Sequence, residues 1–159
     1  MAGRTYTTCL LAERRDLIGA CAALLETTWP DHYGPTGPGF ATKDATDRAQ
    51  TERLPIGLVA IDQTDTLVGT GTLSGPSYGA QSDEAPWITG LCVVEHMHGH
   101  GIASQLVQDL CRVATSTGHR QVFATTSQAL GLMQRAGFAE LRQLNDDHGT
   151  WHVLRKTLS

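Results

Sequence analysis

The segment 87–104 constrains the fold of this 159-residue chain more than any other part. Residues 87–94 are nearly continuous in apolar character, which is typical of a strand covered on both faces. A loop with histidines and glycines follows and leads into a stretch whose apolar residues recur at the spacing of one helix face: Ile102, Leu106, Val107, Leu110, Cys111 and Ala114. A buried strand that leads through a short loop into an amphipathic helix predicts an α/β fold.

The hydrophobic periodicity of the rest of the chain predicts the other elements of a single domain, 1–159. Before the central strand we expect a strand at 5–11, a helix from Asp16, a proline- and glycine-rich loop at 29–39, a polar helix at 41–53 and a hairpin at 56–61 and 67–73. After the long helix we expect a strand at 121–125, a helix capped by Ser127 and ending at 136, and a hairpin at 139–144 and 150–158. The predicted order is β-α-α-β-β-β-α-β-α-β-β, a mixed and mostly antiparallel sheet with helices on both faces.

Charge and composition exclude several classes of protein. The 12 basic and 16 acidic residues give a formal net charge of −4, so the chain has no basic field for nucleic acid. No apolar run approaches the roughly 18 residues that span a bilayer, and no signal-peptide core follows the N-terminus. We therefore expect a cytoplasmic protein that binds neither nucleic acid nor membrane. The four cysteines lie in apolar stretches without a C-x-x-C pair, which favours buried free thiols.

The loop between the central strand and the long helix has the features of an anion site. Backbone N–H groups and the positive end of the helix dipole meet there, and glycines let the backbone approach a pyrophosphate closely. A Walker A loop is excluded because no lysine lies between Lys43 and Lys156. A dinucleotide-binding fingerprint is disfavoured because the next strand ends in Ala124, Thr125 and Thr126 without an acidic residue.

This segment resembles the acetyl-CoA loop of the GNAT N-acetyltransferase superfamily, which has the form V-x-P-x-x-[RQ]-G-x-G-[IV]-[GA]. The matching residues are Val93, His98, Gly99, Gly101, Ile102 and Ala103, with Glu95 in place of the usual proline. Residues 129–138 resemble the family's A-x-x-L-Y-x-x-x-G-F ending, and the order of elements agrees over the whole chain. The resemblance therefore covers the domain and not a single motif.

The resemblance implies a co-substrate and an activity. Acetyl-CoA is the implied co-substrate, with its acetyl-pantetheine arm along Leu91, Cys92 and Val93. Its pyrophosphate is expected on the backbone of seven consecutive residues: His98, Gly99, His100, Gly101, Ile102, Ala103 and Ser104. The implied reaction is direct attack of a primary amine on the thioester in a ternary complex, with the N–H near Val93 stabilising the oxyanion. Whether an acyl group other than acetyl is used stays open.

Two positions depart from the family pattern. Met133 stands where the family has the tyrosine that protonates the leaving thiolate, and Thr89 stands where a glutamate base is common. The nearest hydroxyls are Ser127 and Thr126, and the nearest carboxylates are Glu84 and Asp83. Of these we take Ser127 as the acid and Glu84 as the proton acceptor, with water as the alternative acid. The same departures leave a non-catalytic acyl-CoA-binding module as an alternative function.

The alternation of His96, His98 and His100 suggests a second alternative, a metal site. Imidazoles at this spacing converge on one ion only if the segment is extended. Because two glycines and the start of a helix curl this segment, we expect the histidines beside the phosphates and no metal.

Two further segments are expected to form the acceptor wall, by the same resemblance. These are the loop that contains Trp29, Asp31 and Tyr33, and the last hairpin with Asp146. Aromatic rings supply an apolar wall, and the aspartates attract a cationic amine. The implied partner is a small-molecule amine or a peptide N-terminus, and both a monomer and a homodimer remain open.

Overall fold

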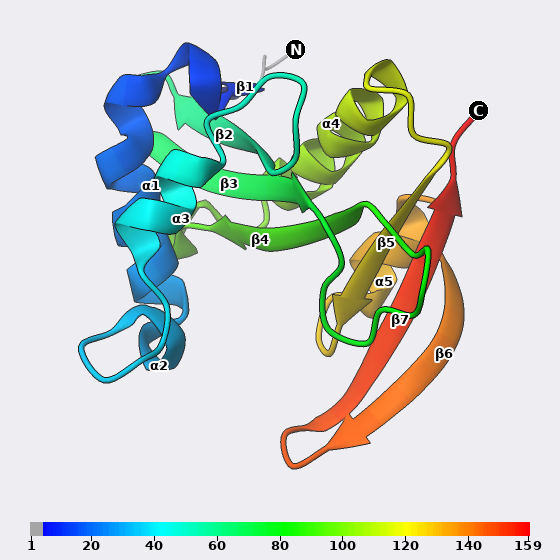
Figure 1. The fold of residues 1–159 in the computed structure, drawn as a ribbon. Coiled ribbons are helices and arrows are strands. Elements are labelled where there is room, and N and C mark those ends of the chain that lie inside the picture. Colours follow the sequence, from blue (N-terminus) through cyan, green and yellow to red (C-terminus); the bar gives the residue numbers. More distant parts are fainter. Residues whose placement is uncertain (1–4) are drawn as a thin grey trace.

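The computed structural model describes residues 5–159, and their strands form one sheet in the order β1-β2-β3-β4-β5-β7-β6 (Figure 1). The strands are β1 Tyr6–Leu10, β2 Ile56–Asp62, β3 Leu67–Ser74, β4 Trp87–Val93, β5 Gln121–Thr126, β6 Ala139–Asp146 and β7 Gly149–Thr157. Only β4 and β5 run parallel, and every other neighbouring pair is antiparallel. The predicted mixed, mostly antiparallel sheet is therefore confirmed.

Helices cover both faces of this sheet (Figure 1). They are α1 Ile18–Thr28, α2 Pro30–Tyr33, α3 Ala41–Asp47, α4 Ile102–Ser116 and α5 Leu130–Arg135. The prediction of an irregular loop at 29–39 is wrong at its start, because Pro30 opens the short helix α2 with its fixed φ. The predicted cap by Ser127 is also wrong. The N–H of Ala129 donates to Thr126 Oγ1 at 2.8 Å, and α5 begins at Leu130.

The long helix α4 packs closely on β3 because two glycines of β3 leave room for it. An added Cβ at Gly69 lies 3.0 Å from Ile102 Cγ2, and one at Gly71 lies 3.0 Å from Leu110 Cδ1. Ile102, Leu106 and Leu110 are completely or almost completely buried in this interface. The position of the α4 N-terminus is therefore fixed by core packing.

Strands β4 and β5 are joined at one end only. Their pairing is limited to Trp87 with Phe123 and Ile88 with Ala124. Beyond it, β4 contains a bulge at Gly90, whose φ is +60°, where two residues of β4 stand opposite one of β3. The bulge bends β4 away from β5, so residues 91–93 have no neighbouring strand on that side.

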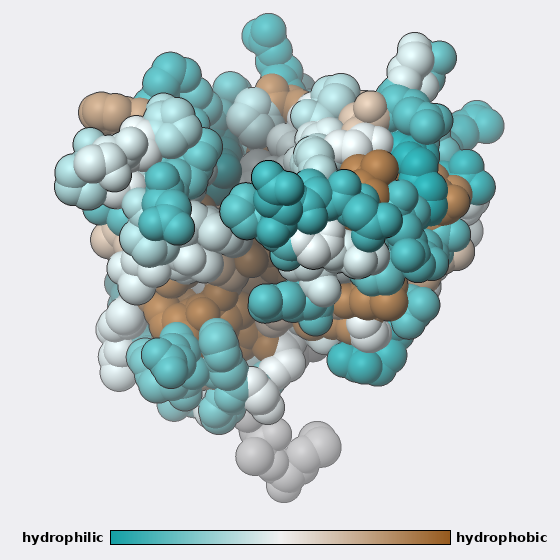
Figure 2. Space-filling model, turned by 90° about the horizontal axis from the view of Figure 1, so that it is seen from below, coloured by the Kyte–Doolittle hydropathy of each residue, from teal (hydrophilic) through white to brown (hydrophobic). Residues whose placement is uncertain are grey.

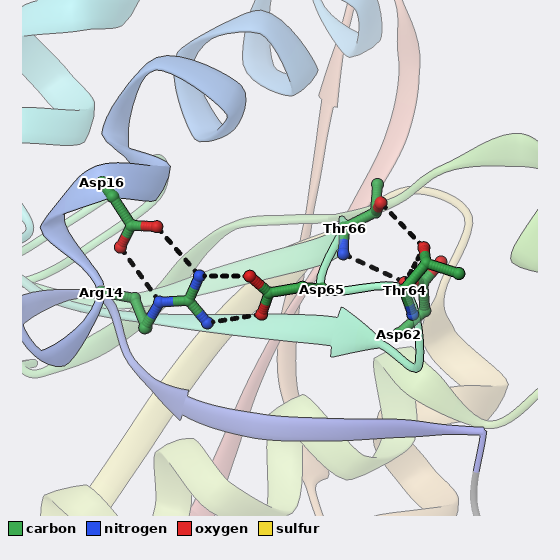
Figure 3. Close-up of polar contacts among 6 residues, drawn as sticks. All are labelled: Arg14, Asp16, Asp62, Thr64, Asp65 and Thr66. Carbon is green, nitrogen blue, oxygen red and sulfur yellow. Dashed lines mark hydrogen bonds and ion pairs between the residues drawn. The ribbon is translucent and has the colours of Figure 1, made fainter.

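A polar network secures the β2–β3 turn (Figure 3). The Arg14 guanidinium donates to both Asp16 and Asp65, and the Asp62 carboxylate accepts bonds from the N–H groups of Thr64 and Thr66. These contacts stabilise the turn. Within residues 5–159, none of the helices has both the length and the apolar character needed to cross a membrane.

Candidate active site

A cavity of about 1100 Å³ lies where β4 leaves β5. The end of β4, the N-terminus of α4, the inner side of α1 and the start of α5 surround it. Figure 2 shows the molecule from below, with hydrophobic residues at the bottom of a hollow between more hydrophilic rims. The cavity is therefore an open cleft between the two diverging parts of the sheet.

The free edge of β4 supplies backbone groups to this cavity. The N–H of Val94 donates to the carbonyl of Val68 on β3 at 2.9 Å. Because successive residues of a strand point their amide groups to opposite sides, the N–H and C=O of Val93 face the cavity. The imidazole of His98 confirms this direction, since its Nε2 lies 2.9 Å from the Val93 carbonyl oxygen and acts as the donor.

The loop before α4 supplies a second set of backbone donors. Gly99 and Gly101 have φ of +85° and +79°, and an added Cβ at either meets nothing within 4 Å. Glycine is thus needed here for its backbone conformation and not for space. Gly101 directly precedes the 15-residue helix α4, and the first turn of α4 contains no acidic residue. The free N–H groups and the positive dipole end of α4 therefore favour an anion in this cavity.

The structure brings most of the predicted co-substrate residues together. The cavity is lined by Leu91, Cys92, Val93, His98, Gly99, Gly101, Ile102, Ala103 and Ser104, whereas His100 does not line it. Sequence reasoning missed the lining residues Ala20, Ala23, Leu24, Thr27, Thr28, Leu67, Val94, Glu95, Met97, Gln128, Ala129 and Leu132. The alanines of α1 that line the cavity, Ala20 and Ala23, are the one signal that the sequence offered, because small residues leave room beside the helix.

The two residues chosen for proton transfer do not reach this cavity. Ser127 is exposed and is not among the lining residues. Glu84 is held by Arg142, whose Nη1 lies 3.0 Å from Oε2, and by the N–H of Gln81 at 2.8 Å. The Arg142 guanidinium lowers the pKa of the Glu84 carboxyl, which makes it a weaker base. Neither side chain lines the cavity, so the geometry does not favour either assignment.

This ion pair gives a prediction that separates stability from catalysis. Glu84→Gln should lower the free energy of unfolding at pH 7 by about 1–3 kcal/mol, since a charged hydrogen bond is lost. Because the folded pKa of Glu84 is lowered, its contribution is present above the unfolded value of about 4.3 and disappears as the pH falls through the folded value. Urea unfolding at several pH values measures this, with the exposed neighbour Asp83→Asn as control. A loss of kcat without a loss of stability would contradict the structural role.

The location of Met133 also differs from the sequence interpretation. It is only 4% exposed and belongs to the core cluster packed under α4. The neighbouring Leu132 lines the cavity instead. The position of the family tyrosine is therefore a core position in this chain, and no side-chain acid stands there.

The expected acceptor residues fall into separate places. The hydroxyl of Tyr33 donates to Asp44 Oδ2 at 2.7 Å, and burial together with that carboxylate raises the pKa of Tyr33 to about 12. Tyr33 borders a smaller cavity of about 240 Å³, while Trp29 and Asp31 are exposed. Asp146 lies in the β6–β7 hairpin, where it accepts from the Tyr78 hydroxyl at 3.0 Å. None of the four lines the large cavity.

The histidine loop does not have the extended form that a metal site requires. Glu95–Met97 form a 3-10 turn, and Gly99 and Gly101 have positive φ. Within residues 5–159 no group of three His, Cys, Asp or Glu side chains is arranged to hold an ion. The metal alternative therefore has no geometric support.

A helix N-terminus beside the free edge of a splayed strand presents backbone groups that suit a phosphate-bearing ligand with an extended, amide-containing arm. Residues 20–138 match the family model described as the acetyltransferase (GNAT) family. The chain belongs to the acetyltransferase (GNAT) family. A search of curated protein sequences gives no significant match.

Several solved structures share the fold of this chain. An aminoglycoside 6'-N-acetyltransferase complexed with coenzyme A superposes with a TM-score of 0.76 at 20% identity, over 95% of this chain and 96% of that chain. The aminoglycoside 6'-N-acetyltransferase from Enterococcus faecium gives 0.75 at 20% identity, over 95% and 96%. A chain of the NatC complex bound to Gag peptide and CoA gives 0.73 at 17% identity, over 97% and 99%.

Proposed function

We propose that the protein transfers an acetyl group from acetyl-CoA to a primary amine by direct attack in a ternary complex. The observation that supports this best is the presence of two sets of backbone donors, on Val93 and at the α4 N-terminus, in one cavity. The residues fit the co-substrate. The free N–H groups at the α4 N-terminus suit a pyrophosphate. The unpaired backbone groups of residues 91–93 suit the amides of the pantetheine arm.

The chemistry of the cavity favours backbone catalysis. The co-substrate supplies the thioester, and the Val93 N–H faces the place where negative charge develops on the acyl oxygen during attack. The carboxylate on the cavity lining is Glu95, which is exposed at the rim and can take a proton from an ammonium group through water. The thiol that leaves is acidic enough to depart with a proton from water.

Cys92 supports direct transfer over an acyl-enzyme. Its thiol lines the cavity, but burial raises its pKa to about 11. Because the thiolate is the nucleophilic form, Cys92 is a poor nucleophile at neutral pH. The acetyl group is therefore transferred directly to the amine, without an acyl-enzyme intermediate on Cys92.

Turnover with a panel of amines tests the proposal. The panel contains aminoglycosides, polyamines, amino acids and peptides with free N-termini, because the similar structures include enzymes named for an aminoglycoside and a complex with a peptide. We expect CoA release that depends on the amine, and no acetylated protein in mass spectra without amine. CoA binding without turnover of any amine would favour the non-catalytic module. Acetyl-Cys92 would contradict direct transfer.

The loop histidines give a prediction with an internal control. His98 lines the cavity and donates to the Val93 carbonyl, whereas His100 does not line it. His98→Ala should weaken CoA binding by about 3- to 10-fold, the value of one hydrogen bond near a phosphate. His100→Ala should leave the affinity nearly unchanged. Calorimetric titration measures both, and equal effects would contradict the different positions of the two rings.

A further inference from the structure

Arg48 is a buried cation without an anion. It follows α3 and is only 9% exposed, yet no ion pair among residues 5–159 includes it. Its Nη1 is buried without a hydrogen-bond partner. The Tyr33 hydroxyl donates to Asp44 Oδ2 and also lies beside the Arg48 guanidinium, so Arg48 meets a neutral hydroxyl and no carboxylate within ion-pair distance among residues 5–159. A buried guanidinium of this kind is costly, which indicates that a partner is missing.

The fold holds the guanidinium in one place. The Arg48 carbonyl accepts from the N–H of Gly57 on β2 at 2.7 Å, and an added Cβ on Gly57 lies 2.9 Å from Arg48 Cβ. An added Cβ on Gly90 of β4 lies 2.8 Å from Nη1. The side chain therefore crosses the sheet from β2 to β4 over two glycines, which leave the space that it occupies.

A second unpaired polar group lies on the same face of the sheet. Gly57 pairs with Thr72 of β3, so their side-chain positions share a face. Gly71 faces α4, and therefore Thr72 faces the opposite side, on which Arg48 lies. The Thr72 Oγ1 is also buried without a partner. Arg48 Nη1 and Thr72 Oγ1, each buried without a hydrogen-bond partner in the described part of the chain, thus border one spot beside the bulge of β4.

Neither Arg48 nor Thr72 lines the cavity, but the spot that they border adjoins its β4 side. Gly90 immediately precedes Leu91 and Cys92, which line the cavity, and lies three residues before Val93. At the rise of a strand this separation is roughly 10 Å. The α4 N-terminus lies on the other side of Val93 along the chain. An acceptor that reaches the acyl group near Val93 can therefore extend its far end toward Arg48.

We propose that Arg48 and Thr72 bind a carboxylate of the acceptor, which makes the acceptor an amine that also carries a carboxylate, such as an amino acid. This inference rests on the proposed function and names its substrate class. A carboxylate matches the planar fork of a guanidinium and accepts a further bond from a hydroxyl. The same buried positive charge disfavours polycationic amines.

Matched acceptor pairs test the proposal. Each amino acid in the panel is compared with its carboxamide, which keeps the amine and loses the negative charge. We expect the wild type to prefer the carboxylate by about 10- to 100-fold in kcat/KM, the range for a charged hydrogen bond. Arg48→Gln should remove this preference by lowering the turnover of carboxylates far more than that of carboxamides, while the affinity for CoA is kept.

Two further variants test whether the effect is specific to the proposed carboxylate site. Thr72→Val has nearly the same shape and should reduce only the use of carboxylates, by a few fold. The exposed Arg53→Gln removes a charge from the same segment and should change nothing. Equal use of both members of each pair by the wild type, or an equal loss of both in a folded Arg48→Gln, would overturn the assignment.

A binding measurement separates this assignment from the proposed function. If no amine is acetylated, the proposed function fails, and calorimetric titration of an N-acetylamino acid still tests Arg48. Binding that is lost in Arg48→Gln supports the carboxylate site. Equal binding by the wild type and the variant, or no binding by either, overturns it.

Discussion

Replacing Gly101 by glutamate should lower the affinity for CoA by about 100-fold or more while the fold persists. Gly101 has a φ of +79° directly before the first turn of α4 and lines the cavity. A glutamate there is strained by about 1–2 kcal/mol and adds a carboxylate beside the helix N-terminus. That carboxylate repels the phosphates and covers the N–H groups that bind them. Calorimetric titration with CoA measures the loss.

Gly118→Glu is the matched control for this substitution. Gly118 has a φ of +92°, has open space around its Cβ position and follows the other end of α4. The backbone strain is therefore similar, but the new charge lies far from the cavity. We expect the two variants to lose similar amounts of thermal stability and only the first to lose CoA binding. Equal CoA affinities would show that the pyrophosphate is bound elsewhere.

The co-substrate side of the cavity could be predicted because its residues are adjacent in the sequence. Residues 91–104 form a strand end, a loop and a helix start, so local patterns define both the elements and the backbone groups that they present. The one lining assignment that failed is His100, which lies between the two positive-φ glycines. The direction of a side chain in such a turn depends on exact backbone angles that the sequence pattern does not determine.

The proton-transfer residues could not be predicted, because residues far away in the sequence determine where the candidate side chains lie and what they bind. Glu84 precedes the central strand, but Arg142, which is 58 residues away, binds its carboxylate. Met133 aligns with a family tyrosine, but the short helix α5 turns it into the core. In both cases tertiary contacts override the expectation from position alone.

Arg48 shows the same limit for charged residues. In the sequence it is one arginine in a polar stretch that is typical of a solvated helix. Its burial results from the glycines at positions 57 and 90, on two strands that are not neighbours in the sheet. Only the sheet order brings these glycines to one face, so no local pattern reveals the buried cation.

Trp87→Ala should be the most destabilising single substitution at the junction of β4 and β5. Trp87 is completely buried and stacks on Phe123 with ring centroids 5.3 Å apart, and this pair forms half of the β4–β5 register. Removing a buried tryptophan costs about 3–5 kcal/mol, since the cavity left behind does not close. At about 2–4 °C per kcal/mol for a chain of this size, the Tm should fall by roughly 6–20 °C.

The same substitution should also weaken CoA binding, because the angle between β4 and β5 is set where the two strands meet. Trp87→Phe keeps an aromatic ring on Phe123 but loses the N–H that donates to the Glu84 carbonyl, so its loss of stability should be smaller. Phe40→Ala, at a ring that is 69% exposed, is the surface control and should change stability by less than about 0.5 kcal/mol. Chemical denaturation and CoA titration measure both effects. If Trp87→Ala loses stability but binds CoA with full affinity, the bulge at Gly90 alone holds β4 away from β5, and the stacked pair serves only the core.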